Sequence, residues 1–409
     1  MNKKEKAFYL AYIGTTKVAF LKAYKRPEKI EIVRLSAHLA KGFERGIVKD
    51  LVEASETLAK SVAEVAGEEK SIFPCRVVIS NNYLKNYIYQ SSIYFQGNPH
   101  PISLKDVRAA IAQTRSVATI PLQEVIVQSV PQEFLVNDLS GVQNPLGLEA
   151  SRLGVTLRLL TLDCLVYNNL LRVFERCDLE ISDIVPSFLS GAHHVLTNDE
   201  KQAGVILVLV GGGVTHFSCY KNSVLIETKS IALGADCITE VISKNLNVDY
   251  LDAQRLKENY GSAIRKTEFK DELIPIPNDE KKKRSIKRYE FEAQISTGLN
   301  HLLGEIKKAV NVLQADYAPL NQVVLMGGGA CLDGFLEVVQ ENICPSARIA
   351  TLGNVIGPET LISNPAFAAV LGGLSFDSRI TEHEMARNGR QNWLTRTVDT
   401  ARNWIFEYL

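Results

Sequence analysis

Three turns that contain glycine, each directly after an apolar run of strand type, constrain the fold of this chain more than any other feature. The turns are Gly14-Thr15-Thr16-Lys17, Gly211-Gly212-Gly213 and Gly327-Gly328-Gly329-Ala330, which follow Ala7 to Ile13, Val205 to Val210 and Val323 to Met326. Glycine lets the backbone approach a ligand closely, so that N–H groups at the end of a strand can point at phosphate oxygens. One such turn is typical of any strand–helix connection, but three in this order indicate two similar α/β halves that close on a nucleotide.

The composition is that of a well-packed globular protein. Of the 409 residues, 46% are hydrophobic and 22% are charged. This length predicts about two to four subdomains. The formal net charge is zero. Because no overall charge attracts the chain to nucleic acid, we expect no nucleic-acid partner.

Cysteine usage and hydropathy indicate a reducing compartment. The seven cysteines are scattered, with no close pair and no histidine at ligand spacing, so we expect small core residues and no metal site. The first residues lack the pattern of a signal peptide, and the longest uninterrupted apolar run, Val205 to Val210, is far too short to cross a membrane. We therefore expect a cytoplasmic protein.

The first half of the chain alternates strands and helices, with a change of pattern in the middle. Apolar periodicity predicts strands at Ala7 to Ile13, Lys17 to Tyr24, Ile30 to Leu35 and Val77 to Ile79, and helices at about Asp50 to Ala66 and from the cap Asp163 to Cys177. From about Leu84 to Leu160, strand-type segments surround a helix at Leu104 to Thr114. This stretch indicates an inserted α+β module.

The second half repeats the strand–glycine–strand pattern of the first. We predict strands near Ile181 and Val205, a hairpin of Val214 to Tyr220 and Ser223 to Ser230 around Lys221-Asn222, helices at Leu251 to Tyr260, Thr297 to Asp316 and Ala366 to Leu374, and a strand at Val323 to Leu325. The polar stretch Phe269 to Arg288 is predicted to be a loop.

The carboxy-terminal segment has the pattern of an amphipathic helix that follows a linker. Residues 379–391 are polar, and both tryptophans of the chain lie after them. A helix over 392–409 places on one stripe Trp393, Leu394, Val398, Trp404, Ile405, Tyr408 and Leu409. Aromatic anchors beside arginines favour binding to anionic lipid. The alternative is a helix that docks on its own globular body or on another protein.

A longer motif carries a resemblance to a known family. The chain contains Val130-Pro131-Gln132-Glu133-Phe134, then Gly141-Val142-Gln143-Asn144-Pro145-Leu146-Gly147-Leu148, then Arg152-Leu153. With this string and its glycine turns, the chain resembles the FtsA family of actin-like cell-division proteins over essentially its full length. The resemblance implies an α/β, actin/Hsp70-like two-lobed fold with an inserted α+β subdomain in the first lobe.

The resemblance also implies a division of the chain into subdomains. The first-lobe core comprises residues 1–83, with its remainder at 162–200 and 358–378, and residues 84–161 form the inserted subdomain. Residues 201–357 form the second lobe, in which about 229–300 is a smaller subdomain. Residues 379–391 are a flexible linker and 392–409 a membrane-targeting helix.

The resemblance implies a scaffold function at the division site. Members of this family polymerise, attach through a C-terminal helix to the cytoplasmic face of the inner membrane, and bind the tail of the tubulin-like protein FtsZ. The basic and apolar residues matching the tail-binding groove are Lys283, Arg284, Ile286, Lys287, Arg288 and Phe291. Ser296-Thr297-Gly298 lacks an arginine of the family pattern. The expected partner is therefore FtsZ or a substitute division protein, together with further copies of this chain.

Departures from the family pattern concern the nucleotide site. Tyr12 stands where the family has an acidic residue before the first turn, and Leu209 and His216 stand where it has two more around the second turn. These acids hold Mg²⁺ and its water, and neither tyrosine nor leucine can replace a carboxylate as a ligand. We therefore expect a pseudo-ATPase with no catalytic residue and no metal ligand.

ATP is the candidate cofactor of this site, with no expected dependence on Mg²⁺. Gln254 replaces a glutamate of the family, whereas Lys257 matches its lysine. The residues that we expect around any bound nucleotide are Gly14, Thr15, Thr16, Lys17, Gly211, Gly212, Gly213, Lys257, Gly327, Gly328 and Gly329.

Two alternatives stay open from the sequence. One is a working ATPase whose metal site is rebuilt from Asp163, Asp183 or Asp236. The other is an actin-like platform of a pilus or secretion machine. The insert motif around Pro131 and Asn144 is not found in such platforms.

Overall fold

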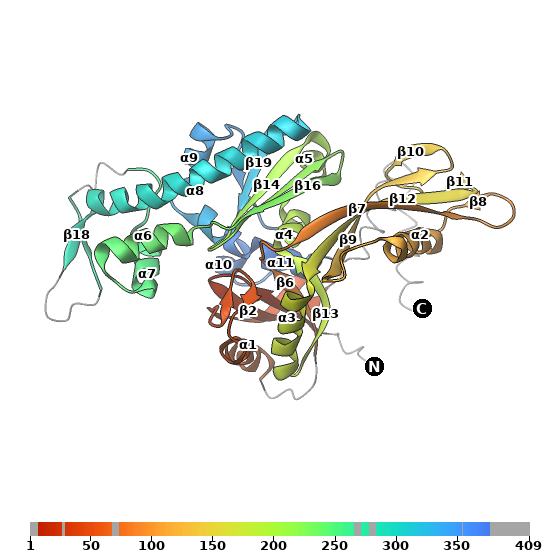
Figure 1. The fold of residues 1–409 in the computed structure, drawn as a ribbon. Helices are drawn as coiled ribbons and strands as arrows, with labels where there is room; N and C mark the ends of the chain where they lie inside the picture. Colours follow the sequence, from red (N-terminus) through yellow and green to blue (C-terminus); the bar gives the residue numbers. More distant parts are fainter. Residues whose placement is uncertain are drawn as a thin grey trace. The chain divides into compact units, whose positions relative to one another are not determined.

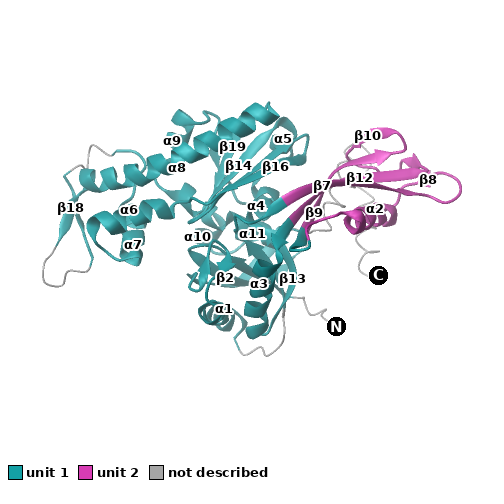
Figure 2. Cartoon of the chain, in the orientation of Figure 1, with its two compact units in different colours: residues 1–85, 122–127, 161–376 teal, residues 86–121, 128–160, 377–409 magenta. Residues whose placement is uncertain are grey.

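The computed structural model describes residues 7–26, 29–67, 73–265, 271–277, 284–353 and 355–376. The chain forms two compact units, which Figure 2 distinguishes by colour. Of the described residues, unit 1 comprises those within 7–85, 122–127 and 161–376, and unit 2 comprises 86–121 and 128–160. The predicted linker 379–391 and amphipathic helix 392–409 lie outside the described residues.

The first sheet of unit 1 has six strands with helices on both faces (Figure 1). Its strand order is β13 (Leu179–Pro186), β6 (Phe73–Ile79), β1 (Ala7–Ile13), β2 (Lys17–Lys25), β3 (Ile30–Leu39) and β21 (Val355–Ile356). On one face, Tyr9 shares a core with Leu58 of α1 (Leu51–Ala66) and Phe174 of α3 (Cys164–Arg176). Leu10 faces the other side, where Gly373 of α11 (Ala368–Ser375) lies against it and α4 (Ser187–Val195) packs on α11.

The second sheet of unit 1 has five strands. Its order is β16 (Val224–Ile231), β15 (Thr215–Lys221), β14 (Val205–Val210), β19 (Gln322–Met326) and β20 (Arg348–Ile349). One core unites this sheet with α6 (Asp236–Leu246), α7 (Tyr250–Tyr260), α8 (Arg288–Tyr317) and α9 (Phe335–Asn342). Beside it lies the hairpin of β17 (Leu273–Pro275) and β18 (Ser285–Lys287).

The two sheets repeat one topology. Numbered in the order in which they occur along the polypeptide, the first three long strands of each sheet form an antiparallel meander, β1-β2-β3 in one and β14-β15-β16 in the other. The first strand also pairs in parallel with a fourth, which pairs in parallel with a fifth. The order β3-β2-β1-β6-β13 therefore corresponds to β16-β15-β14-β19-β20. The predicted pair of similar α/β halves is confirmed.

Unit 2 contains most of the inserted α+β module. Its four-stranded sheet has the order β10 (Leu139–Val142), β9 (Glu124–Val136), β12 (Arg152–Asp163) and β7 (Lys85–Tyr94). The helix α2 (Leu104–Val117) begins with a capping box of Ser103 and Asp106, and Ser91 of β7 bonds Thr114 of α2 at 2.6 Å. The short strands β8 (His100–Pro101) and β11 (Glu149–Ala150) pair with each other.

An arginine fastens the end of α11 to the first sheet. Arg76 of β6 forms a two-bond ion pair with Asp183 of β13, with Nε at 2.9 and 3.0 Å from the two carboxylate oxygens. Its Nη1 donates to the carbonyl of Gly373 at 2.8 Å and also to that of Phe376. Phe376, the last described residue, is thus bonded to Arg76 of the central strand β6.

Several predicted element bounds were wrong. Helix α8 begins at Arg288 rather than Thr297, because Phe291 and Ile295 continue its buried face. The predicted loop from Phe269 contains the hairpin of β17 and β18. The turn after β15 is at Asn222-Ser223, where both residues have positive φ. The helices α4, α5 (Asn198–Ala203), α6, α9 and α10 (Glu359–Ile362) were not predicted.

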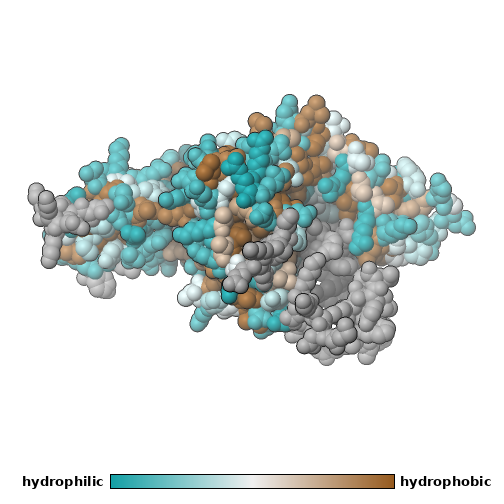
Figure 3. Space-filling model, turned by 90° about the horizontal axis from the view of Figure 1, so that it is seen from below, coloured by the Kyte–Doolittle hydropathy of each residue, from teal (hydrophilic) through white to brown (hydrophobic). Residues whose placement is uncertain are grey.

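The described surface mixes polar and apolar residues. On the face in Figure 3, hydrophobic and hydrophilic residues alternate over short distances. Individual large apolar side chains are exposed, such as Leu122 at 96% and Leu165 at 73%. None of the described helices combines the length and the apolar character that crossing a membrane requires.

Candidate nucleotide-binding site

The first and second glycine turns lie against each other. A Cβ placed on Gly212 would be 2.7 Å from the methyl carbon of Thr16, and one on Gly213 would be 2.7 Å from that of Thr15. Only glycine allows this approach, since any larger residue would displace a threonine. The structure therefore brings together the turn after β1 and the turn after β14, and their backbones and threonines form one continuous surface.

Local hydrogen bonds shape both turns. The N–H of Gly14 donates to the carbonyl of Lys17 at 3.0 Å, and that of Gly211 to the carbonyl of Val214 at 2.9 Å. The carbonyls of Gly211 and Gly212 accept from the N–H groups of Ala235 and Asp236, each at 2.9 Å. These bonds satisfy N–H groups at the start of α6 that lack a partner within the helix.

The third turn packs against the end of β14. Gly327 has φ +95°, and a Cβ on it would lie 2.4 Å from the carbonyl oxygen of Val210. A Cβ on Gly329 would lie 2.3 Å from a methyl of the same valine. At Gly328, by contrast, nothing lies within 4 Å of the Cβ position. Of these three glycines, Gly328 is the one with room beside it for a ligand.

A series of hydrogen bonds joins the two sheets at Tyr12 and His216, two of the positions where this sequence lacks the acidic residues of the family pattern. The ring of Tyr12 covers Gly14, with its hydroxyl oxygen 3.1 Å from the glycine's Cβ position. Tyr12 hydrogen-bonds with Ser80, which follows β6. The Oγ of Ser80 lies 3.1 Å from Nε2 of His216 on β15. Leu209, the register partner of His216, is 2% exposed.

Tyr12 and His216, the two end residues of this series of hydrogen bonds, are uncharged near neutral pH. Burial lowers the pKa of His216 to about 4, and the residue is 1% exposed. Burial also raises the pKa of Tyr12 to about 12, against the opposing effect of its bond with Ser80. A neutral imidazole and a phenol do not provide the hard, anionic oxygens that Mg²⁺ prefers.

The three aspartates that could rebuild a metal site lie apart. Asp163 caps α3 through the N–H of Leu165 at 2.8 Å, and Asp183 is paired with Arg76. Asp236 lies beside the second turn, with Oδ2 2.7 Å from the Cβ position of Gly212. Over the described ranges, no group of three or more His, Cys, Asp or Glu is placed to hold a metal ion.

The charges around Asp236 do not favour a cation. Burial raises the pKa of its carboxyl group, while a hydrogen bond with Tyr250 and the charges of Lys257 and Arg45 act in the opposite direction. Oδ1 of Asp236 is buried and has no hydrogen-bond partner in the described part of the chain. A divalent cation here would be repelled by the positive side chains of Lys257 and Arg45, which oppose the attraction of Asp236 and Glu240.

The two lysines of the predicted site have different surroundings. Lys257 is 8% exposed, and its Nζ donates to the hydroxyl of Thr239 at 2.8 Å and to the carbonyl of Ala235 at 3.2 Å. Its ammonium group is therefore engaged at the start of α6. Lys17 extends from the first turn, and its Nζ lies 4.6 Å from the ring centre of Phe367.

Sequence reasoning missed two residues of this region, Ser80 and Arg45. Arg45 occupies the turn between β4 (Phe43–Glu44) and β5 (Ile47–Val48). Its Cγ is 3.2 Å from the Cβ position of Gly213. Nothing in the sequence places the turn at Arg45-Gly46 beside the second glycine turn.

The predicted partner-binding residues are only partly on the surface. Phe291 is fully buried in the core of the second sheet, so its prediction as a surface contact was wrong. Ile286 packs against the same core. Arg284 donates to the carbonyl of Leu246 at 3.0 Å, Lys287 pairs with Asp271 at 3.5 Å, and Arg288 pairs with Glu272 at 2.6 Å. Lys283 lies outside the described residues, as do all seven predicted membrane contacts.

Comparison with known proteins identifies related sequences over most of the chain. Residues 206–372 match the model of the family described as cell division protein FtsA, and residues 82–161 match the SHS2 domain inserted in FtsA. The cell division protein FtsA of Escherichia coli (strain K12) is 25% identical over 407 residues, which cover 96% of this chain and 94% of that protein.

Solved structures with the same architecture share little sequence with this chain. A PilM–PilN type IV pilus biogenesis complex matches with a TM-score of 0.61 at 14% identity, covering 91% of this chain and 98% of the other. MreB5 of Spiroplasma citri bound to ADP matches with a TM-score of 0.54 at 12% identity, covering 93% and 98%. The predicted actin-like α/β fold with an inserted subdomain is confirmed.

Proposed function

Because this chain belongs to the FtsA family of cell-division proteins, we propose that it is a scaffold that links a division component to the inner membrane. It self-associates, binds FtsZ or a substitute division protein, and attaches peripherally to the cytoplasmic face through residues 392–409. Within this proposal, the subdomain boundaries are those predicted from the sequence. The proposal rests on the family match and on the apolar stripe of the tail.

The scaffold acts without efficient ATP hydrolysis. The observation that carries this part of the proposal is the chain from Tyr12 through Ser80 to His216, which places neutral, hydrogen-bonded side chains where the family pattern has acids. Phosphoryl transfer depends on a correctly held metal ion and on neutralisation of the developing charge. Without the acids, we expect hydrolysis to be slower by several powers of ten.

Nucleotide binds weakly at the three glycine turns, and its binding does not depend on Mg²⁺. The residues that support this are those of the two turns in contact, from Gly14 to Lys17 and from Gly211 to Gly213, together with Gly328 beside open space. The relative MreB5 has been solved with ADP, which is a property of that protein. Here the three turns provide N–H and hydroxyl groups that can donate to phosphate oxygens.

The partner surface is the face around the hairpin of β17 and β18. Arg284, Lys287 and Arg288 provide positive charge there, and each already contacts a carbonyl or a carboxylate of this chain. An acidic peptide therefore has to compete with Asp271 for Lys287 and with Glu272 for Arg288. We infer an affinity that falls with added salt, since exposed ion pairs are screened.

The scaffold proposal is tested by sedimentation with anionic liposomes and by hydrolysis of Mg·ATP. The full-length protein should sediment with the liposomes, whereas a chain truncated after Gly389 should stay in the supernatant. Turnover should be at background level. Sedimentation of the truncated chain would contradict the tail assignment, and robust Mg²⁺-dependent turnover would contradict the pseudo-ATPase assignment.

A pull-down with a peptide of the FtsZ tail separates the division role from a pilus platform. The likeness to the PilM–PilN complex concerns the fold alone, whereas residues 82–161 match the FtsA-type insert. Capture of the peptide, weakened by the substitution Lys287→Glu, is the expected result. No capture at low salt would mean that the partner is a different protein.

A further inference from the structure

The turn that carries Arg45 has an unusual backbone. Arg45 and Gly46 have φ of +50° and +70°, and they join the two short antiparallel strands β4 and β5. Two left-handed residues in a two-residue hairpin are normally asparagine, aspartate or glycine. An arginine in this conformation is strained, and such strain persists where the surroundings fix it, often at functional sites.

The surroundings fix this turn firmly. A Cβ on Gly46 would lie 2.5 Å from the carbonyl oxygen of Ser80, so the turn is wedged against the end of β6. The side-chain amide of Asn81 also donates to the carbonyl of Gly46 at 3.4 Å. With the backbone held in this way, the side chain of Arg45 is directed at the second glycine turn, where its Cγ approaches Gly213.

The charge of Arg45 acts at the two glycine turns. It is one of the charges that lower the pKa of Asp236, whose carboxylate lies beside Gly212. Among the residues that the structure describes, none forms a hydrogen bond or ion pair with the Arg45 guanidinium. Lys257 is engaged at the start of α6, and Glu240 is the other charged group that faces Asp236. Arg45 is thus a cation that an anion at this surface can bind.

We propose that Arg45 binds the phosphates of a nucleotide at the first and second turns and takes the place of a divalent cation there. The inference rests on the proposed function and extends it, because it explains how a site without metal-holding acids can still neutralise an anionic ligand. A planar guanidinium donates two parallel hydrogen bonds to phosphate oxygens and keeps its charge at any physiological pH. Lys17 adds a second positive charge from the first turn.

The experiment is a calorimetric titration of the full-length protein with ATP, in Mg²⁺ and again in EDTA. The variant Arg45→Asn removes the charge and places at φ +50° a residue that tolerates this conformation, so it should melt no lower than the wild type. Lys41→Asn, on an exposed residue before the same hairpin, is the matched control for charge. Arg45→Lys keeps the charge but loses the two-bond geometry.

The expected result is wild-type affinity that agrees within about twofold between Mg²⁺ and EDTA. Arg45→Asn should lose at least about tenfold in both buffers, Arg45→Lys should lose less, and Lys41→Asn should bind like the wild type. The inference is overturned by unchanged binding in Arg45→Asn, by loss of wild-type binding in EDTA, or by a wild type that binds no ATP at all. None of these outcomes affects liposome sedimentation, so they are distinguishable from failure of the scaffold proposal.

Discussion

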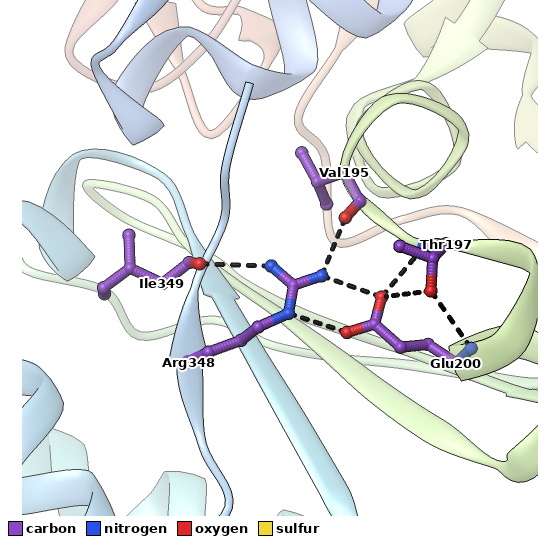
Figure 4. A network of polar contacts seen from close by, with 5 residues as sticks. All are labelled: Val195, Thr197, Glu200, Arg348 and Ile349. Carbon is purple, nitrogen blue, oxygen red and sulfur yellow. Dashed lines mark hydrogen bonds and ion pairs between the residues drawn. The ribbon is translucent and has the colours of Figure 1, made fainter. Parts of the chain in front are cut away.

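Arg348 and Glu200 form a two-bond ion pair that fastens strand β20 to helix α5. Nε of Arg348 lies 2.6 Å from one carboxylate oxygen of Glu200, and Nη2 lies 2.7 Å from the other (Figure 4). The same Nη2 donates to the carbonyl of Val195 at 2.9 Å, at the end of α4. Glu200 also accepts from the backbone N–H of Thr197 in a capping box. The carboxylate of Glu200 therefore links β20 to the start of α5, and Arg348 extends this link to the end of α4.

The substitution Glu200→Gln should lower the free energy of unfolding by about 2 kcal/mol, since it weakens charge-assisted hydrogen bonds of a largely buried group. Burial alone raises the pKa of Glu200, but the bonds from Arg348 and Thr197 lower it below its usual value. Urea denaturation at pH 7 measures the loss. Asp199→Asn, on the neighbouring exposed residue, is the control and should change stability by less than about 0.5 kcal/mol. Equal losses in the two variants would contradict the role of the ion pair.

Arg76 should contribute more than any exposed ion pair, because its Asp183 partner and two carbonyls are only partly accessible to water. Asp183→Asn should cost about 3 kcal/mol, as expected when one member of a buried pair is removed. Hydrogen exchange should show faster exchange in α11 than in the wild type. Glu180→Gln, an exposed position on the same strand, should leave exchange in α11 unchanged. If both variants exchange alike, Arg76 does not hold that helix.

Acidification should destabilise the fold through His216, which is buried, and His194, which is half-buried. Burial lowers the pKa of His216 to about 4, and burial with the nearby charge of His193 lowers that of His194 to about 4. An unfolded histidine titrates near ~6.5, so the unfolded chain binds more protons between these values. The stabilisation is complete above about pH 6.5 and is lost as the pH falls towards 4, by up to about 3 kcal/mol for each histidine.

The test of this pH effect is the slope of unfolding free energy against pH. Wild type and His216→Gln are compared by urea denaturation at several pH values between 7.5 and 4.5. The variant is less stable at pH 7.5 but should have a shallower slope, since one proton-linked group is gone. His301→Gln, on an exposed position of α8, should keep the wild-type slope. Parallel curves for wild type and His216→Gln would refute the role of that histidine.

The tightness of the glycine turns can be tested with a pair of alanine substitutions. A Cβ on Gly234 would lie 2.2 Å from the carbonyl oxygen of Gly212, whereas Gly328 has nothing within 4 Å. Gly234→Ala should therefore cost about 2 kcal/mol or more through backbone displacement, and Gly328→Ala should change stability by less than about 1 kcal/mol. Thermal melting of both variants measures the difference. A neutral Gly234→Ala would mean that α6 is free to move away from the second turn.

The sequence predicted the strands well where an apolar run has a clear start and end. Ala7–Ile13 and Val205–Val210 coincide with β1 and β14, and Asp163 caps α3 as its position indicated. The start of α8 was missed because Ser296-Thr297-Gly298 has low helix propensity. Gly298 is there for packing, since a Cβ on it would lie 2.7 Å from the Cα of Ile238 on α6. Tertiary contact overrides local propensity at this point.

The candidate site was predictable only in part. The glycine turns and the substitutions at Tyr12 and His216 are visible in the sequence because they belong to contiguous motifs. Ser80 and Arg45 are not, because they reach the turns from separate segments through the pairing of β6 with β1 and through a wedged hairpin. Phe291 was assigned to the partner-binding groove through the family resemblance, yet helical periodicity places it on the buried face of α8.

The contact between Arg76 and Phe376 also has a mechanical meaning. Tension applied to the chain at Phe376 would act on α11 and also, through the hydrogen bond from Arg76, on β6, which is flanked by β1 and β13. Strands that are paired along their length resist such a load by shear, in which many hydrogen bonds must break at once rather than one after another. A scaffold that is pulled at this end would therefore share the load between α11 and the centre of its first sheet.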